Sequence, residues 1–327
     1  MPVHVRASLV LVFTCACWAF SFPAMKALTQ VGAAHEPGAS SLFLSFLCVA
    51  LRFTSAGFLL GVSCVGSRPW FTRLEWEQGL GIGVMGGMGL VLQMDGMAYT
   101  LASTSAFLTQ AYCVVIPIWV SLLNRMFPAP RVVGACALTL AGAAVLAGLG
   151  TDGFRFGRGE WETLAGSLSF TGQILWLERP RYRVNRARHA TVIMFLTMAA
   201  TAWPFAFLLA PAGRPVGVAY ANVASLGLFA LLVGLCTLVT FPLAVAWQPK
   251  VSATQAGLLY CTEPIFTSVV ALFVPGWLSR LAGIDYANEH LTPNLVLGGL
   301  LILGANAWLV LRPPPSLPAP STAQPSA

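Results

Sequence analysis

Apolar residues occur in this chain as long runs separated by short polar stretches. The runs show neither the alternation of a half-buried strand nor the one-sided stripe of an amphipathic helix. A helix crosses about 30 Å of hydrocarbon with roughly 20 apolar residues. We therefore expect an all-α integral membrane protein with ten transmembrane helices. The runs are residues 7–28, 40–64, 79–100, 103–123, 132–150, 161–177, 190–210, 222–245, 252–274 and 294–311.

Composition supports the same fold class. The 327 residues are 57% hydrophobic and only 9% charged, whereas a soluble domain is about 25% charged. So few charges cannot cover a water-exposed surface, and a lipid bilayer is the expected surrounding. The formal charge of +7 does not predict a nucleic-acid partner, because the basic residues lie in short loops. The first run is too long for a signal peptide, so we interpret it as an uncleaved helix.

Lysines and arginines predict the orientation of the helices. Cytoplasmic loops carry an excess of these residues. If both termini are cytoplasmic, 12 of the 18 lie inside and 5 lie outside. The densest cluster, residues 178–189, then lies inside. We expect a multi-pass membrane protein whose N- and C-termini are both cytoplasmic.

The two halves of the chain are weakly similar when one is shifted by 148 residues, which aligns Tyr112 with Tyr260. Since five helices is an odd number, a second copy would enter the membrane from the other side. That arrangement is the inverted repeat of many transporters, although chance similarity between apolar helices is an equal alternative. The predicted parts are a first five-helix repeat at 1–150, a second at 151–312 and a disordered C-terminal tail at 313–327.

Several segments together resemble one known family. They are "CWAFSFPAMKAL", "LRF", "LQMDGMAYTLASTSAFLTQAYCVVIPIW", "LLYCTEPIFTSVVALF" and "NEHLTPNLVLGGLLILGA". In order and spacing they resemble the drug/metabolite transporter superfamily, specifically its EamA-like ten-helix members. The resemblance implies two inverted five-helix repeats around a central cavity, and export of small metabolites or drugs across the bacterial inner membrane. One departure is the longer connection "GWLSRLAGIDYANEHLTP" before the last run.

The ninth run carries a charge and a helix breaker at its centre, Glu263 and Pro264. Proline lacks an N–H and frees the carbonyl of Tyr260. Lipid cannot satisfy that carbonyl, so the break must line protein or water. On a continuous helix, Tyr260 and Thr267 lie on the face of Glu263. These groups predict a substrate or proton pathway; the alternative is a structural kink with Glu263 tied to a basic residue.

Other ionisable residues lie within the runs. A charge at the bilayer centre costs about 2.5–3.5 kcal/mol on insertion scales, so it should face a partner or a wet cavity. Arg52 lies at the centre of the second run, and we hypothesise that it pairs with Glu263; the alternative is a structural arginine. Asp95, with Tyr99 one turn away, lies at the depth of Lys26. Asp95 and Lys26 are expected to pair, as an outer gate or as a permanent ion pair.

Two aromatic residues, Trp18 and Tyr112, are further candidates for the cavity wall, although aromatic residues in a bundle usually pack. Pro117 predicts a second helix break, in the fourth run. The eight cysteines lie in or beside apolar runs without zinc or CxxC spacing, so we expect packing residues and no disulfide. A GxGxxG match at Gly81, Gly83 and Gly86 opens an apolar run and predicts close helix packing instead of a nucleotide site.

Together these patterns favour a secondary transporter for a small organic solute. Glu263 is the first candidate for proton coupling, because removal from water favours the neutral form of a carboxyl group. The alternatives are a passive channel or facilitator and a membrane-embedded enzyme acting on lipids. We do not expect an enzyme, because no histidine lies in a run and no catalytic cluster is visible. We expect no cofactor and no metal, and a homodimer is left open.

Overall fold

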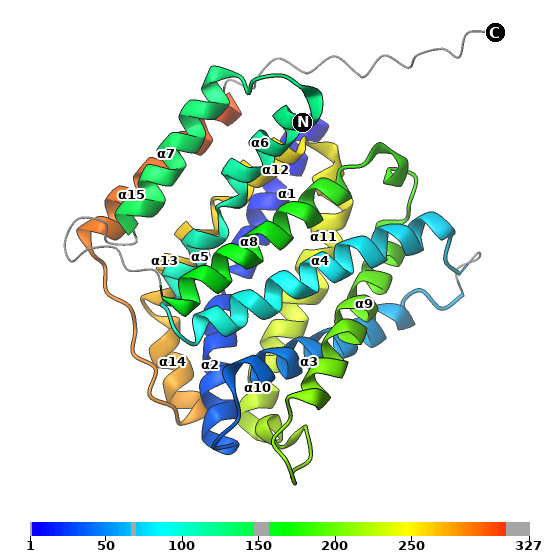
Figure 1. Cartoon of the computed structure of the whole chain (residues 1–327), viewed down its shortest axis with the longest axis vertical. Coiled ribbons are helices and arrows are strands. Elements are labelled where there is room, and N and C mark those ends of the chain that lie inside the picture. The colour runs from blue at the N-terminus through cyan, green and yellow to red at the C-terminus, as the bar shows by residue number, and fades with distance from the viewer. Residues whose placement is uncertain (1, 67–69, 147–156, 312–327) are drawn as a thin grey trace.

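The computed structural model describes residues 2–66, 70–146 and 157–311, and every element within these ranges is helical. The predicted tail at 313–327 lies outside the described residues, as do Arg68, Arg155 and Arg312 of the loops. The helices are α1 Val3–Trp18, α2 Ser21–His35, α3 Ser41–Val62, α4 Arg73–Met97, α5 Ala102–Thr109, α6 Tyr112–Asn124, α7 Pro130–Leu146, α8 Arg158–Leu177, α9 Ala187–Leu208, α10 Val223–Val233, α11 Thr240–Trp247, α12 Ala253–Tyr260, α13 Glu263–Ala271, α14 Val274–Ala282 and α15 Pro293–Leu311 (Figure 1).

A helix, or a pair of successive helices, lies in each of the ten predicted apolar runs. Within the described ranges, six helical segments are long and apolar enough to cross a membrane. A seventh candidate combines the α12–α13 segment with α14, which is bent away by 57°. Helices α7 and α15 are apolar but shorter in the part searched, and α8 carries several charged residues in its first turns. The membrane class is therefore supported, and the count of ten spans stays a prediction.

Three of the apolar segments are interrupted near their middle. The first predicted run is two helices, because α1 ends at Trp18 and α2 begins at Ser21. Helix α12 ends at Tyr260 and α13 begins at Glu263, with Pro264 in its first turn. The break predicted at Pro264 is confirmed. Proline fits the first turn of a helix because its missing N–H has no intrahelical partner there.

The break predicted at Pro117 is wrong in position. Pro117 lies inside α6, and the chain is interrupted earlier, at Gln110 and Ala111, where backbone N–H groups bond to carbonyls three residues back. The carbonyl that Pro117 frees, that of Cys113, accepts from the Cys136 thiol at 3.3 Å. A thiol donor from α7 thus satisfies the group, so α6 continues through its proline.

Helix α4 packs against both α8 and α9, and its glycines permit this close approach. A Cβ on Gly83 would lie 2.6 Å from the Thr197 Cβ of α9, and one on Gly96 would lie 2.7 Å from the Gly159 carbonyl of α8. Such distances leave no space for a side chain. The helix-packing interpretation of the GxGxxG match is confirmed.

The two halves share helix boundaries at an offset other than the predicted one. Helices α5 and α12 begin at residues 102 and 253, and α6 and α13 begin at 112 and 263, so both pairs are 151 apart. This register places Tyr112 opposite Glu263, whereas the sequence shift of 148 placed it opposite Tyr260. Across the halves, α3 packs on α9 and α7 packs on α15. The division into two inverted repeats stays a prediction.

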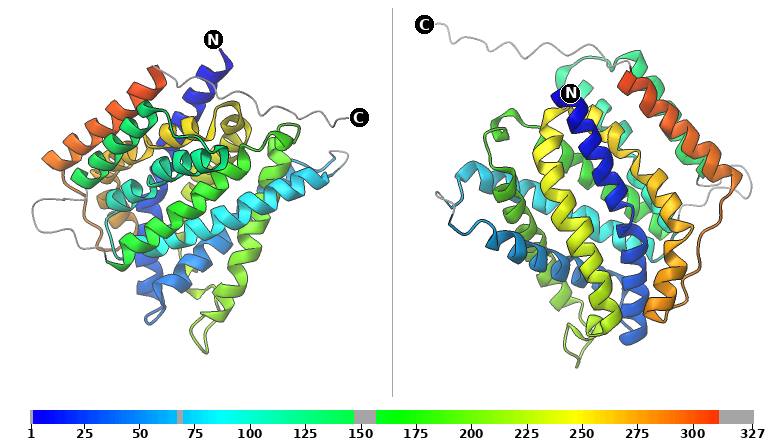
Figure 2. Two further views of the ribbon diagram at one scale, coloured as in Figure 1. Left: turned by 45° about the horizontal axis from the view of Figure 1, so that its top comes forward. Right: turned by 180° about the vertical axis from the view of Figure 1, so that it is seen from behind.

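The start of α1 and the end of α15 lie at the same end of the molecule in all views (Figure 1 and Figure 2). At the opposite end, α14 packs against α2 and α10. This short helix was not predicted, and it occupies the long connection before the last run. All eight cysteines are buried and free, which agrees with their interpretation as packing residues.

Candidate functional site

A cavity of about 100 Å³ lies in the middle of the helical bundle. This volume holds several water molecules or one small solute. The residues on either side of all three helix breaks line it: Trp18 and Ser21, Thr109 and Tyr112, and Tyr260 and Glu263. The cavity therefore lies where the interrupted helices meet. Its other lining residues are Phe22, Arg52, Leu90, Gln93, Phe170, Gln173, Ile174, Leu177, Phe241, Ala244, Val245 and Gln248.

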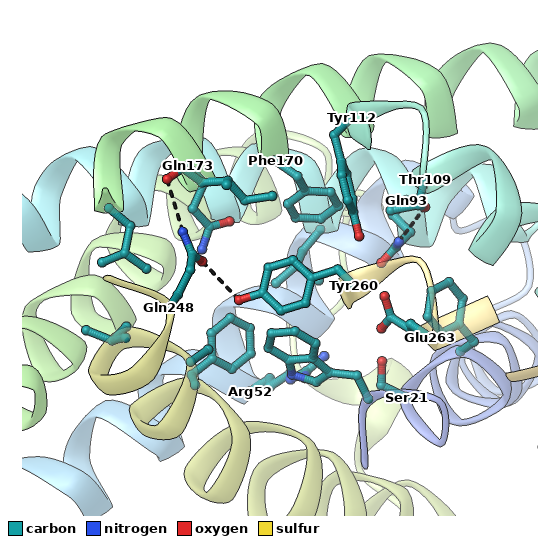
Figure 3. A pocket seen from close by; sticks show the side chains of 18 residues that line it. Ser21, Arg52, Gln93, Thr109, Tyr112, Phe170, Gln173, Gln248, Tyr260 and Glu263 are labelled. Atoms are coloured by element: carbon teal, nitrogen blue, oxygen red, sulfur yellow. Dashed lines mark hydrogen bonds between the residues drawn. The ribbon is translucent and has the colours of Figure 1, made fainter. Parts of the chain in front are cut away.

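Five predicted site residues line this cavity, and four do not. Those that do are Glu263, Arg52, Tyr260 and Tyr112, which Figure 3 labels, and Trp18. The others lie elsewhere: Asp95, Lys26, Tyr99 and Thr267.

Glu263 is the acidic residue of the cavity wall and is only 8% exposed. It is the first residue of α13, where the positive end of the helix dipole favours a carboxylate. Its polar neighbour is the side-chain amide of Gln110, at the break between α5 and α6. No ion pair to Glu263 is found among the described residues. In Figure 3 its carboxylate turns toward the same part of the cavity as the hydroxyls of Tyr112 and Ser21.

Arg52 does not pair with Glu263, so that hypothesis is wrong. Its Nε donates to the Thr237 hydroxyl at 2.7 Å, and its two terminal nitrogens donate to the Cys236 carbonyl at 3.1 Å and to the Met25 sulfur at 3.6 Å. Cys236 and Thr237 belong to a π-helical turn, Gly234–Val239, between α10 and α11. A π-turn leaves backbone groups without their usual partners, and the Cys236 carbonyl accepts from both Arg52 and the Thr240 hydroxyl.

Aromatic side chains form a connected arc along the cavity. The ring of Trp18 lies 5.4 Å from that of Phe241 and 5.7 Å from that of Tyr260, and the rings of Tyr260 and Tyr112 are 6.5 Å apart. Four helices contribute to this arc: α1, α11, α12 and α6. The indole N–H of Trp18 is buried and has no partner among the described residues.

Glutamines complete the polar part of the wall, and sequence reasoning missed most of them. Gln248 accepts from the Tyr260 hydroxyl at 2.9 Å and donates to the Ile174 carbonyl at 3.1 Å. Gln93 donates to the Thr109 hydroxyl at 2.8 Å and bridges α4 to α5. A glutamine within or at the end of an apolar run was the sequence signal for these residues. That signal does not reveal whether the side chain faces the cavity or another helix.

Asp95 and Lys26 do not pair, contrary to the prediction. Arg158 of α8 donates to Asp95 at 2.6 Å and to the Tyr99 hydroxyl at 2.8 Å. Lys26 donates to the backbone carbonyl of Thr100 at 2.6 Å. The partner was missed because Arg158 precedes the predicted sixth run and was treated as a loop residue.

Thr267 is fully buried, and its hydroxyl has no partner among the described residues. It lies one turn after Glu263 on α13, as predicted, but it does not line the cavity. Tyr260 belongs to the preceding helix and reaches the cavity from the other side of the break.

No protein-family model and no curated protein matches this sequence. A solved crystal structure of a protein aligns with 94% of this chain and with 98% of its own, at a TM-score of 0.59 and 18% sequence identity. At this identity the likeness shows that the two chains share a fold, and it carries no information on activity.

Proposed function

We propose that this protein is a secondary transporter that moves a small organic solute through the central cavity, in the direction of export. The observation that carries the proposal is the convergence of three interrupted helices on a cavity that holds a buried carboxylate. Interrupted helices at mid-membrane are typical of transporter binding sites, because their free backbone groups must face a cavity instead of lipid. The proposal agrees with the resemblance of the sequence to EamA-like transporters of the bacterial inner membrane.

Glu263 is the group that we propose to carry a coupling proton. A buried carboxyl group without an ion-pair partner is readily held in its neutral form, and Glu263 has no such partner among the described residues. Because Arg52 is bound to the π-turn, the coupling does not pass through a Glu263–Arg52 pair. The proton instead changes the charge of the cavity itself.

In the proposed cycle the two five-helix repeats rock about the cavity. The contacts of Lys26 with Thr100 and of Arg158 with Asp95 lie beyond the cavity, at the end that the charge distribution predicts to be outside. The lining residues Leu177 and Gln248 lie at the ends of α8 and α11 that are predicted to be inside. These positions support a state that is closed outside, with its cavity extending toward the cytoplasm.

Transport can be tested in inverted membrane vesicles with an imposed pH gradient. Uptake of labelled amino acids, nucleosides, weak acids and organic cations is compared between the unmodified protein and the Glu263→Gln variant. We expect the pH gradient to drive uptake of at least one of these solute classes by the unmodified protein. In the Glu263→Gln variant, the pH gradient should increase uptake no more than it does in vesicles without the protein.

The matched control is Glu77→Gln, the same chemical change at a residue that pairs with Arg181 outside the cavity. This control should transport normally. Full gradient-dependent uptake by Glu263→Gln would contradict proton coupling at this residue, and uptake that ignores the gradient in every variant would favour a passive facilitator.

A further inference from the structure

The two charged side chains of the cavity wall differ in how freely they can bind a ligand. Glu263 and Arg52 are the two charged residues among those that line the cavity. Each of the three nitrogens of Arg52 already donates to an acceptor of the protein, in the π-turn and at Met25. A guanidinium held in this way is a fixed part of the wall, because releasing it would give up three hydrogen bonds at a buried position.

Glu263 is in the opposite situation. Its carboxylate faces the cavity, and no basic side chain among the described residues neutralises it. An ionised carboxylate that is buried without a counter-ion is costly, and a cationic ligand would remove this cost. An anionic ligand would instead place two like charges together in a site of low dielectric constant.

The aromatic arc offers a second, independent attraction for the same kind of ligand. The rings of Trp18, Tyr260 and Tyr112 are connected by centroid distances of 5.7 and 6.5 Å, and Tyr260 and Tyr112 flank helix breaks next to Glu263. Aromatic faces attract cations through the ring quadrupole, most strongly when water is excluded. They also offer flat apolar area for the rest of the solute.

We infer that the cavity binds a small organic cation, an amine or ammonium compound whose positive group lies at the Glu263 carboxylate and whose flat apolar part lies against Trp18, Tyr260 and Phe241. This inference rests on the proposed function, since it names the substrate class of the same site. The bound cation and the coupling proton use the same carboxylate, so they occupy it at different times.

Three ligands with a shared benzyl skeleton test this inference: phenethylamine is a cation, phenylalanine a zwitterion and phenylacetate an anion at neutral pH. Binding to the purified full chain in detergent is followed by tryptophan fluorescence, since Trp18 lines the cavity. We expect phenethylamine to bind about tenfold or more tightly than phenylacetate, with phenylalanine no better than phenethylamine. The comparison uses the unmodified protein, so it does not depend on the folding of a variant.

Variants locate the preference. Glu263→Gln should weaken phenethylamine binding by about tenfold or more, and Glu77→Gln should leave it within about twofold. Tyr260→Leu, which removes one ring of the arc, should weaken the cation several-fold and affect phenylacetate less.

The inference is overturned if phenylacetate or phenylalanine binds best, or if none of the three ligands binds. Uptake into proteoliposomes shows whether the inference about the substrate class fails or the proposed transport function fails. An anion or zwitterion that binds and is carried would leave transport standing and remove the inference. Phenethylamine that binds at Glu263 without being carried would support the inference and contradict transport.

Discussion

At the scale of single residues, burial inside the helical bundle could be predicted from the sequence, and partners could not. The sequence placed Arg52, Asp95 and Glu263 within apolar runs, and all three are buried. Every predicted pair among them and Lys26 was wrong. Depth alone does not fix the rotation of a helix about its axis, and the actual partners include a backbone carbonyl, a hydroxyl and an arginine from outside the predicted runs.

Arg52 provides a test of residue-scale structure. Arg52→Lys keeps the charge but cannot reach three acceptors at once, because lysine lacks the planar fork of donors. We expect the free energy of unfolding to fall by about 1–3 kcal/mol, seen as a lower midpoint of thermal unfolding in detergent.

The control is Arg131→Lys, since Arg131 is exposed at the start of α7. It should unfold at the midpoint of the unmodified protein. An Arg52→Lys variant as stable as this control would show that the bonds to the π-turn contribute little.

At the scale of the helices, the sequence located the segments well and their interruptions unevenly. Long apolar runs specify buried or lipid-facing helices regardless of details, which is why each run contains one. The break before Pro264 follows from proline chemistry. The break at Ala19 and Phe20 is followed by Pro23 in the first turn of α2, a proline signal that the sequence interpretation did not use. The break at Gln110 and Ala111 has no proline in the first turn of α6, so local sequence could not reveal it.

Replacement of Pro264 tests whether the interruption of α12–α13 matters. Pro264→Ala restores an N–H that can donate to the Tyr260 carbonyl and so extends the helix across the break. We expect stability to rise by about 1 kcal/mol and transport into vesicles to fall several-fold, because Glu263 would turn with the continuous helix.

Pro117→Ala is the control for this change, because the carbonyl freed by Pro117 already accepts from Cys136. It should alter stability and transport less than Pro264→Ala. Undiminished transport by Pro264→Ala would mean that the break is not part of the pathway.

At the scale of the whole molecule, the arrangement of the helices follows from packing between halves that are distant in sequence. The glycines of α4 were visible in the sequence, and their neighbours on α8 and α9 were not. The offset between the halves was predicted as 148, while the helix boundaries give 151. Similarity of residue type between apolar helices is too weak to determine the offset between the two halves. The positions at which the helices begin determine it better.

The account depends on a cavity that water reaches inside a protein that lipid surrounds. Ser21 lines the cavity, and Phe58 on α3 is 69% exposed and is expected to face acyl chains. A Ser21→Cys and a Phe58→Cys variant are labelled in vesicles with a small charged thiol reagent that does not cross membranes. The unmodified protein, whose eight cysteines are all buried, gives the baseline.

We predict that Ser21→Cys is labelled at least several-fold above the baseline from the cytoplasmic side, and that Phe58→Cys stays at the baseline from both sides. Ser21→Cys that is protected from the reagent on both sides of the membrane, or Phe58→Cys that reacts as readily as Ser21→Cys, would contradict the account.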